Sequence, residues 1–435
     1  MEYVKELTRD YNELMHWDKK HLWHPYTQHK EYSSIDPLYV VRAKGIYLYD
    51  VNGKVYYDTI SSWWCNILGH GRKDLVKAIC QQANRLDHTL FSGVVHSPAI
   101  ELTREISRFL PSHLTRFFFS DNGSTAIEVA IKMAFQYWKM KGERRNLFLF
   151  LEDSYHGDTI GAMSVSGTSQ FNSYFKDLFF KAKSVPSPAV DWQRSLDRIE
   201  SILKKKTSEV CALLIEPLLQ CAGGMKIYPV EFLNGLEVLR RKYNFFVICD
   251  EIAVGLGRLG RFLACEGSSL RPDFVCLSKA LTNGMLPLAL TITTEKVFKA
   301  FWGDYSTQTF FHGHTYTANP IACRVATETI RLLNNGSYLK GVKDIENRLR
   351  KFANKIEIAA ARIKNSKALG VIWRAEVEGA DREEMFSLYL NGLRSGVILR
   401  PLGNVVYLFL PLVVKKRELE DILDRTYDSI IKTLS

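Results

Sequence analysis

The sequence predicts an α/β protein of two parts, a large domain around a mainly parallel β-sheet and a smaller α+β domain. Short apolar runs alternate with amphipathic helical segments through the middle of the 435-residue chain, which is typical of a parallel sheet. Aromatic and β-branched runs fill the first 60 residues, and a pattern of helix, strand and helix returns near the end. We therefore expect the smaller domain to be assembled from both chain ends.

The first predicted element is an antiparallel hairpin. The stretch "LYVVRAKGIYLYDVNGKVYYD" (38–58) is rich in strand-forming residues, and Asn52-Gly53 between two of its runs indicates a two-residue turn. A helix is predicted next in "RKDLVKAICQQANRL" (72–86). Its predicted apolar face consists of Leu75, Ile79, Ala83 and Leu86.

Six apolar runs are candidates for the strands of the central sheet. They are "RFFFS" (116–120), "LFLFL" (147–151), "CALLIE" (211–216), "FFVICD" (245–250), "FVCL" (274–277) and "LALTIT" (288–293). The carboxyl ends of parallel strands meet at one edge of a sheet, which is where such folds bind ligands. We therefore search for chemistry at the ends of these runs.

The C-terminal part predicts a return to the smaller domain. "VVYLFLP" (405–411) is a further strand, and an amphipathic helix ends the chain. The predicted buried face of that helix consists of Leu419, Leu423, Ile430 and Leu434. We place the N-terminal part of the smaller domain at 1–60, the large domain at 61–337 and the C-terminal part of the smaller domain at 338–435.

Composition narrows the classes of function. The chain has 58 basic and 47 acidic residues, but the basic residues are scattered and no nucleic-acid-reading module accompanies them, so we expect no nucleic-acid partner. Eight cysteines without C-x-x-C spacing are typical of reduced core thiols. The charged, amphipathic N-terminus has no apolar signal segment, and no run of 18 apolar residues occurs, so we expect a cytoplasmic protein with no membrane partner.

Three of the predicted strands end at polar residues that could take part in catalysis or binding. One run ends on Asp250, another is followed directly by Lys279, and a third passes through residues 121–123 into a helix beginning near Ser124. The free N–H groups of a helix N-terminus bind phosphate, although the same pattern alone is more typical of plain capping. An acid or a lysine alone is more typical of an ion pair or of a surface loop.

The combination of these three groups indicates one cofactor. Pyridoxal phosphate requires a phosphate site, an acid beside its ring nitrogen and a lysine that bonds to its aldehyde. Lys279 is the candidate for this covalent anchor, and Asp250 is the candidate for the acid.

Four motifs make the sequence resemble the class III aminotransferases of pyridoxal phosphate fold type I. They are "YHGDTIGAMSVSG", "DEIAVGLGRLG", "LSKALTNG" and "HGHTYTANPIAC", and they lie in the family's order over nearly the whole chain. The resemblance implies a mainly parallel seven-stranded sheet and a homodimer with shared active sites.

The resemblance also implies roles for individual residues around the cofactor. Lys279, Asp250 and Tyr155 would be catalytic, and Tyr155 would also stack on the cofactor ring. The other implied cofactor-binding residues are Gly123, Ser124, His156, His314 and Thr315. Thr315 would reach the phosphate bound in the neighbouring subunit. His314 is a departure, because the better-known members that act in biotin synthesis more often have proline there.

Two further stretches narrow the resemblance within the family. "HLWHPYTQ" (21–28) and "ISSWWCNILGHGR" (60–72) resemble the branch that acts in biotin biosynthesis. Its members convert 8-amino-7-oxononanoate to 7,8-diaminononanoate with S-adenosylmethionine as amino donor. Two alternatives stay open, lysine as the donor and a different ω-amino substrate.

The predicted substrate site combines aromatic and basic side chains. Its members are Tyr26, Trp63, Trp64, Tyr155, Arg258, Lys279, Gly313 and Arg400. The aromatic rings suit an alkyl chain and a sulfonium cation, although core packing is an equal alternative for Trp64. Arg400 suits the carboxylate of the oxononanoate and Arg258 that of the donor.

Two other readings of the motifs have little support. "GLGRLG" (255–260) matches the dinucleotide-binding pattern, but it opens no clear helix, which argues against a nicotinamide-dependent oxidoreductase. His21, His24 and His29, or His312 and His314, lack the further ligands of a metal site, so we expect no metal.

Overall fold

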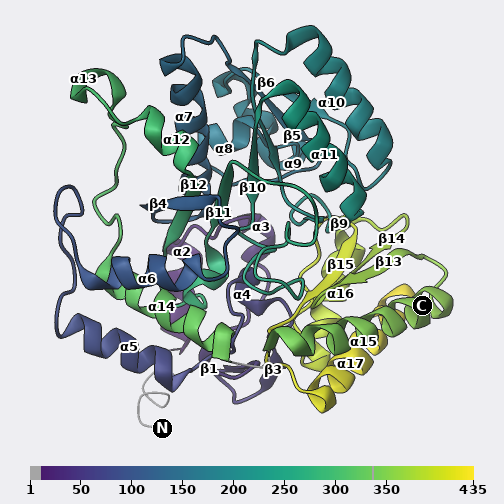
Figure 1. The fold of residues 1–435 in the computed structure, drawn as a ribbon. Helices are drawn as coiled ribbons and strands as arrows, with labels where there is room; N and C mark the ends of the chain where they lie inside the picture. The colour runs from purple at the N-terminus through teal and green to yellow at the C-terminus, as the bar shows by residue number, and fades with distance from the viewer. Residues whose placement is uncertain (1–10, 336–337) are drawn as a thin grey trace.

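A seven-stranded sheet lies at the centre of the computed structural model, which describes residues 11–335 and 338–435 (Figure 1). Residues 1–10, the first part of the N-terminal segment that the sequence predicts to be amphipathic, lie outside the described residues. The spatial order of the strands is β4 (Leu114–Ser120), β12 (Ala289–Thr294), β11 (Phe274–Leu277), β10 (Phe246–Asp250), β7 (Val210–Ile215), β5 (Leu147–Leu151) and β6 (Ala182–Val185). The predicted α/β class and the mainly parallel sheet are confirmed.

All six predicted strands form, but one of them runs against the others. β12, predicted from "LALTIT", pairs antiparallel with both β11 and β4. The connection from β11 to β12 contains only a short 3₁₀ turn, η2 (Lys279–Thr282), and no crossover helix. A parallel return requires such a crossover, so this connection reverses the chain direction.

Helices cover both faces of the sheet (Figure 1). The helix α7 packs along five of the seven strands and also contacts α8 and α12, while α10 and α11 pack against each other on the opposite face. β7 and β10 are buried along their whole length, because their strands are covered on both sides. These helices are α7 (Gly123–Met140), α8 (Ile160–Ser164), α10 (Trp192–Lys206), α11 (Val230–Tyr243) and α12 (Glu295–Ala300).

Three helices form a layer beside the sheet, α5 (Lys73–Ala83), α6 (Ser97–Ser107) and α14 (Pro320–Asn335). The predicted buried face of α5 is partly wrong. Its buried residues are Leu75, Ala78 and Gln82, whereas Ala83 is exposed. The residues that pack against α14 lie about one position earlier in the chain than the predicted ones, at 78 and 82 rather than at 79 and 83.

Elements from the two chain ends lie against each other, while the predicted division into domains stays a prediction. β1 (Val40–Lys44), β2 (Tyr47–Asp50) and β3 (Val55–Tyr57) form one antiparallel sheet, and β13 (Ile363–Leu369), β14 (Ile372–Val377) and β15 (Val405–Phe409) form another. The helices of this part are α15 (Tyr338–Ala359), α16 (Arg382–Ser395) and α17 (Lys416–Leu434). Tyr57 N–H donates to Gly396 O at 2.9 Å, and Phe409 N–H donates to Thr59 O at 2.8 Å. These bonds join segments more than 300 positions apart.

The hairpin between β2 and β3 forms, although its turn is longer than predicted. Asp50 N–H donates to Lys54 O at 3.0 Å, which leaves three residues in the loop. Gly53 adopts a left-handed φ of 81°, as the last position of such a loop requires. The Asp50 carboxylate accepts from the N–H groups of Asn52 and Lys54, and these two bonds favour the longer turn.

The remaining described elements are α2, of 11 residues, and several shorter ones. They are α2 (Tyr11–His21), α3 (His29–Tyr32), α4 (Ser61–Trp64), α9 (Ser169–Asn172), η1 (Ser173–Leu178), α13 (Tyr305–Gln308), β8 (Leu219–Gln220) and β9 (Lys226–Ile227). None of the eight cysteines is in a disulfide, and six of them are buried. Within the described ranges, no helix is both long enough and apolar enough to cross a membrane.

Candidate active site

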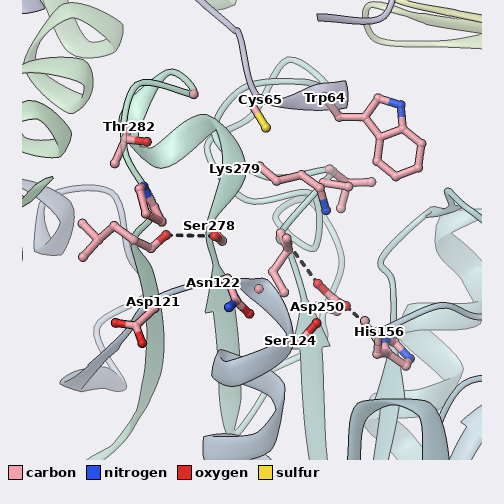
Figure 2. Close-up of a pocket in the computed structure, with 18 of the residues that line it drawn as sticks. Trp64, Cys65, Asp121, Asn122, Ser124, His156, Asp250, Ser278, Lys279 and Thr282 are labelled. Carbon is pink, nitrogen blue, oxygen red and sulfur yellow. Dashed lines mark hydrogen bonds and ion pairs between the residues drawn. The ribbon is translucent and has the colours of Figure 1, made fainter. Parts of the chain in front are cut away.

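A cavity of about 430 Å³ opens at the carboxyl ends of the parallel strands. Residues that follow β4, β5, β10 and β11 line it, so the strand-end rule found the right place. Figure 2 shows Lys279 extending across the cavity, with Trp64 on one side and Asp250 and Ser124 on the other. The predicted site residues that line it are Trp64, Gly123, Ser124, Tyr155, His156, Asp250 and Lys279.

The N-terminus of α7 forms an anion cradle in this cavity. Asn122 caps the helix, because its Oδ1 accepts from Thr125 N–H at 3.1 Å. No described residue accepts from the N–H groups of Gly123 and Ser124, which are therefore available to an anion. Gly157 passes so close that a Cβ there would lie 1.9 Å from Ser124 Oγ, so only glycine fits beside the cradle.

A buried carboxylate lies at the end of β10. Asp250 is 5% exposed, and its Oδ1 accepts from Ile252 N–H at 3.1 Å. His156 Nδ1 lies 2.8 Å from Asp250 Oδ2, and the imidazole holds this carboxylate in a fixed orientation (Figure 2). A buried carboxylate is stable as an anion only with such partners. Asp250 is therefore suited to bind a cationic ring nitrogen.

Lys279 faces the same cavity from the end of β11. Its backbone has a left-handed φ of 45°, a conformation that costs a non-glycine residue about 1 kcal/mol or more. No described residue forms an ion pair or hydrogen bond with its amine, which lies 5.4 Å from the centre of the Trp64 ring. An unpaired lysine held in a strained conformation inside a cavity is suited to a chemical role.

Glu216 is a site residue that the sequence interpretation missed. It lines the cavity, and its carboxylate accepts from the N–H groups of Tyr155 and Cys221, both at 2.9 Å. Burial raises the pKa of Glu216 to about 7. Glu216 directly follows β7, so the strand-end rule that selected Asp250 would also have selected it.

The predicted residues Tyr26, Trp63 and Arg400 are outside the lining of the cavity and meet it through Tyr155; we call this group the mouth of the cavity. Tyr26 OH donates to Asp158 Oδ2 at 2.5 Å and lies 3.1 Å from Tyr155 OH. Burial and the bond to Asp158 raise the pKa of Tyr26 to about 12. The Tyr26 ring packs on Trp63, and the Arg400 guanidinium lies 4.4 Å from the centre of the Trp63 ring. The structure thus brings together the predicted residues Tyr26, Trp63, Tyr155 and Arg400. The sequence interpretation missed Asp158, although this residue lies within the motif "YHGDTIGAMSVSG".

The turn α4 presents Trp64 to the cavity. All four of its residues have left-handed φ values between 45° and 70°. Ser62 N–H and Oγ donate to the carboxylate of Asp58, which also contacts His70, and these bonds hold the turn. Trp64 stacks on Phe409 and lines the cavity at the same time, so core packing and the predicted site role are both satisfied.

Arg258 does not reach the cavity, contrary to the prediction that it binds substrate. It is fully buried and donates to Trp64 O at 2.9 Å, to Leu410 O at 2.7 Å and to Ser61 Oγ at 3.1 Å. Burial lowers the pKa of Arg258 to about 9. The guanidinium therefore supports α4 from behind. The surrounding stretch 255–260 forms turns rather than a helix, which removes the dinucleotide-binding interpretation.

The segment that contains Gly313, His314 and Thr315 lies beside the cavity rather than in its lining. Gly313 and Thr315 are exposed. His314 Nδ1 lies 2.7 Å from Oδ2 of Asp121, which lines the cavity next to the anion cradle.

Comparison with known proteins agrees with this geometry. Residues 27–430 match the family model described as Aminotransferase class-III. The chain belongs to the class III aminotransferases. The adenosylmethionine-8-amino-7-oxononanoate aminotransferase of Geobacter sulfurreducens is 36% identical over 97% of this chain and 98% of its own length. The enzyme of that name from Synechococcus elongatus is 39% identical over 92% of this chain and 96% of its own length.

Solved structures of similar proteins have the same fold. The adenosylmethionine-8-amino-7-oxononanoate aminotransferase of Methanocaldococcus jannaschii superposes with a TM-score of 0.94 at 33% identity, over 97% of this chain and 99% of that one. A transaminase from the marine bacterium Virgibacillus superposes with a TM-score of 0.91 at 26% identity, over 97% of this chain and 99% of that one. The fold is therefore shared by enzymes with different names, and the substrate must be argued from the site.

Proposed function

We propose that this aminotransferase uses pyridoxal phosphate to transfer an amino group from S-adenosylmethionine to 8-amino-7-oxononanoate, giving 7,8-diaminononanoate for biotin synthesis. The observation that carries the proposal is the cluster of Tyr26, Trp63 and Arg400 beside Tyr155, which lines the cavity that contains Lys279 and Asp250. The names of the relatives with 33–39% identity support the same reaction. A step in the synthesis of a small metabolite also fits the cytoplasmic location expected from the sequence.

The residues present fit the cofactor. The free N–H groups at the start of α7 suit its phosphate, the buried Asp250 suits its ring nitrogen, and the unpaired amine of Lys279 suits its aldehyde. When bound, pyridoxal phosphate supplies an aldehyde that accepts amino groups and a ring that withdraws electrons from the adjacent carbon.

Each side chain around the cofactor would have a separate role in the reaction. Asp250, oriented by His156, would keep a proton on the ring nitrogen. Lys279 would anchor the cofactor and, once displaced by the substrate amine, would take a proton from the substrate carbon and return it as general base and acid. Tyr155 would pack on the ring, and Glu216 fixes its position by accepting from its N–H group.

The mouth of the cavity suits two successive substrates. The Arg400 guanidinium, stacked on Trp63 and free of any ion pair with a described residue, is available to a carboxylate. The rings of Tyr26 and Trp63 offer apolar contact to an alkyl chain and electron-rich faces to a sulfonium cation. Both substrates would bind in one pocket in turn, because Lys279 is the single lysine among the described residues that line the cavity.

We further propose a homodimer with shared active sites. Thr315 lies outside the cavity of its own chain and is exposed, so it is free to reach a neighbouring subunit. Trp302, Tyr305, Phe311 and Tyr316 are more than half exposed around the same segment. Large apolar side chains gathered in this way are typical of a protein interface.

The test measures the two half-reactions separately. Purified protein saturated with pyridoxal phosphate is mixed with S-adenosylmethionine, lysine or ornithine, and the loss of the near-visible absorption band is recorded. We expect S-adenosylmethionine to bleach the band and 8-amino-7-oxononanoate to restore it with formation of 7,8-diaminononanoate, detected by mass spectrometry. Bleaching by lysine alone would identify lysine as the amino donor in place of S-adenosylmethionine. Failure of 8-amino-7-oxononanoate to restore the band would reject the proposed acceptor.

A further inference from the structure

Asn283 ends the short turn that presents Lys279 to the cavity. The turn η2 contains four residues, and Lys279 and Asn283 both have left-handed φ values, 45° and 54°. Asn283 N–H donates to Ala280 O at 3.0 Å. A 3₁₀ turn of this length has few hydrogen bonds of its own, so its shape depends on contacts with neighbouring segments. The side chain of Asn283 makes such contacts, although it does not line the cavity.

The Asn283 amide is bonded to one earlier segment of backbone. Asn283 is 3% exposed, its Oδ1 accepts from Ile67 N–H at 2.9 Å and from Leu68 N–H at 2.7 Å, and its Nδ2 donates to Gly69 O at 3.0 Å. A buried amide whose oxygen and nitrogen are both bonded can be removed only by leaving these partners unpaired. The amide therefore joins the turn of Lys279 to a segment 214 to 216 positions earlier in the chain.

The segment that Asn283 holds is itself fixed from its other side. His70 N–H donates to Gly45 O at 2.7 Å, and Gly45 N–H donates to His70 O at 3.0 Å. Leu412 N–H donates to Ile67 O at 2.9 Å. These bonds come from elements of both chain ends. The amide is therefore bonded to a segment whose position is already set.

The same segment continues the wall of the cavity that faces Lys279. Trp64 and Cys65 directly precede it, and both line the cavity (Figure 2). Gly284 follows Asn283, and a Cβ at Gly284 would lie 2.9 Å from Cys65 Cβ, so the two segments pass in close contact. The Lys279 amine lies 5.4 Å from the centre of the Trp64 ring. This spacing depends on the bonds that hold the two segments together.

We propose that Asn283 is a positioning residue for the reaction, because its amide fixes the turn of Lys279 against the segment that carries Trp64. The inference rests on the proposed function, in which Lys279 takes a proton from the substrate carbon and returns it. Such a transfer requires the amine within hydrogen-bonding reach of that proton, and a displacement of about 1 Å slows it strongly. Loss of the amide then lowers the rate of the chemical step more than it changes substrate affinity, which the proposed function assigns to the mouth of the cavity.

Three variants test the amide without disturbing the backbone conformation. Asn283→Gly removes the three side-chain bonds, and glycine adopts the left-handed φ of this position without strain. Asn283→Asp retains an oxygen that accepts from the N–H groups of residues 67 and 68. Asn244→Gly is the matched control, because it makes the same substitution at an exposed left-handed residue that ends α11. Urea denaturation establishes that each variant is folded under the assay conditions.

The rates of both half-reactions are followed by absorption of the bound cofactor over a range of substrate concentrations. We expect Asn283→Gly to slow both reactions about tenfold at saturating substrate, with little change in the concentration that gives half the maximal rate. Asn283→Asp should lie between this variant and the wild type, and Asn244→Gly should match the wild type. Wild-type rates in Asn283→Gly, or a loss confined to substrate affinity, would overturn the inference. If Asn283→Gly does not fold, the same comparison is made with Asn283→Asp.

A second readout needs neither substrate nor cofactor. Full-length protein without added cofactor is treated with iodoacetamide, and alkylation of Cys65 in the cavity wall and of Cys80, an exposed residue on α5, is followed by mass spectrometry. We expect Cys65 to react several-fold faster in Asn283→Gly than in the wild type, while Cys80 reacts equally in both. An unchanged rate at Cys65 would show that the amide does not hold the two segments together and would overturn the inference. A wild type that binds no pyridoxal phosphate would instead reject the proposed function.

Discussion

At the scale of single residues, the chemistry follows from where apolar strands end. Asp250 and Lys279 were found because each follows a fully buried run, where a charged side chain requires a partner or a use. Glu216 meets the same criterion but was overlooked, because an acidic residue at the end of a strand is common. Its hydrogen bonds to the N–H groups of Tyr155 and Cys221 are what mark it as a site residue.

Arg258 and Arg400 illustrate what the sequence leaves open. Both arginines lie in apolar surroundings, and both were expected to bind carboxylates. Arg258 donates to Leu410 O, a carbonyl 152 positions away, whereas Arg400 stacks on Trp63 at the mouth of the cavity. Only the tertiary contacts decide between a structural and a binding arginine.

Replacing Arg400 tests the acceptor side of the site. We expect Arg400→Lys to raise KM for 8-amino-7-oxononanoate about tenfold with little change in kcat, because a lysine loses the bidentate bond and the stacking contact. The half-reaction with the amino donor should be unaffected. Arg350→Lys, an exposed arginine paired with Glu346 on α15, is the control. An unchanged KM for the acceptor would contradict the role given to Arg400.

At the scale of elements, the interior strands of the central sheet could be predicted from the sequence, because they are buried on both faces and nearly continuous in apolar residues. β4 lies at one edge and is only partly buried, but its three phenylalanines still predicted it. The sequence missed β6, "AKSV", and β13, "IKNSKAL", because these strands at the edges of their sheets are short or polar. The direction of β12 depends on the missing crossover helix rather than on its own residues.

The turn α4 depends on a network that the motif alone does not reveal. Asp58 is 2% exposed and accepts from Ser62 N–H, Ser62 Oγ and His70. We expect Asp58→Ala to lower the free energy of unfolding by about 2 kcal/mol, since it removes the hydrogen bonds that the buried carboxylate accepts from Ser62 and His70. It should also weaken cofactor binding, because Trp64 and Cys65 would shift. Urea denaturation and cofactor titration measure the two effects.

Asp58→Asn is the matched variant, because its side chain retains one acceptor oxygen. Its loss of stability should be smaller than that of Asp58→Ala. If both variants unfold at the wild-type urea concentration, the turn is held by other contacts, with Arg258 as the first candidate.

At the scale of the whole molecule, one smaller domain assembled from both chain ends stays a prediction, and the structure shows the two ends in contact. The contacts that unite them, such as Tyr57 OH donating to Asp421 Oδ2 at 2.7 Å, join residues 364 positions apart. No local pattern predicts such a pair. The prediction of a shared active site between two subunits belongs to this scale and awaits measurement of the oligomeric state.

Buried carboxyl groups predict how stability changes with pH. Burial raises the pKa of Glu251 from 4.5 to about 7 in the folded protein. Its favourable contribution is therefore complete below about pH 4.5 and is lost as the pH rises through about 7. Glu216 and Asp273 act in the same direction. We expect the free energy of unfolding to fall over this range.

The variant Glu251→Gln isolates one of these groups, which lies outside the lining of the cavity. It should be less stable at acidic pH, because its amide cannot accept from both Ala264 and Cys265 N–H groups. Its stability should change less with pH than that of the wild type. An identical slope in urea denaturation from mildly acidic to neutral pH would show that Glu251 is ionised throughout.

The most direct test of the central claim is to locate the cofactor on the chain. Wild-type protein and Lys279→Ala are incubated with pyridoxal phosphate, reduced with borohydride to make the bond permanent, digested and analysed by mass spectrometry. The account predicts one modified peptide in the wild type, with the added mass on Lys279, and none in the variant. Modification of another lysine, or equal labelling of both proteins, would contradict the active site described above.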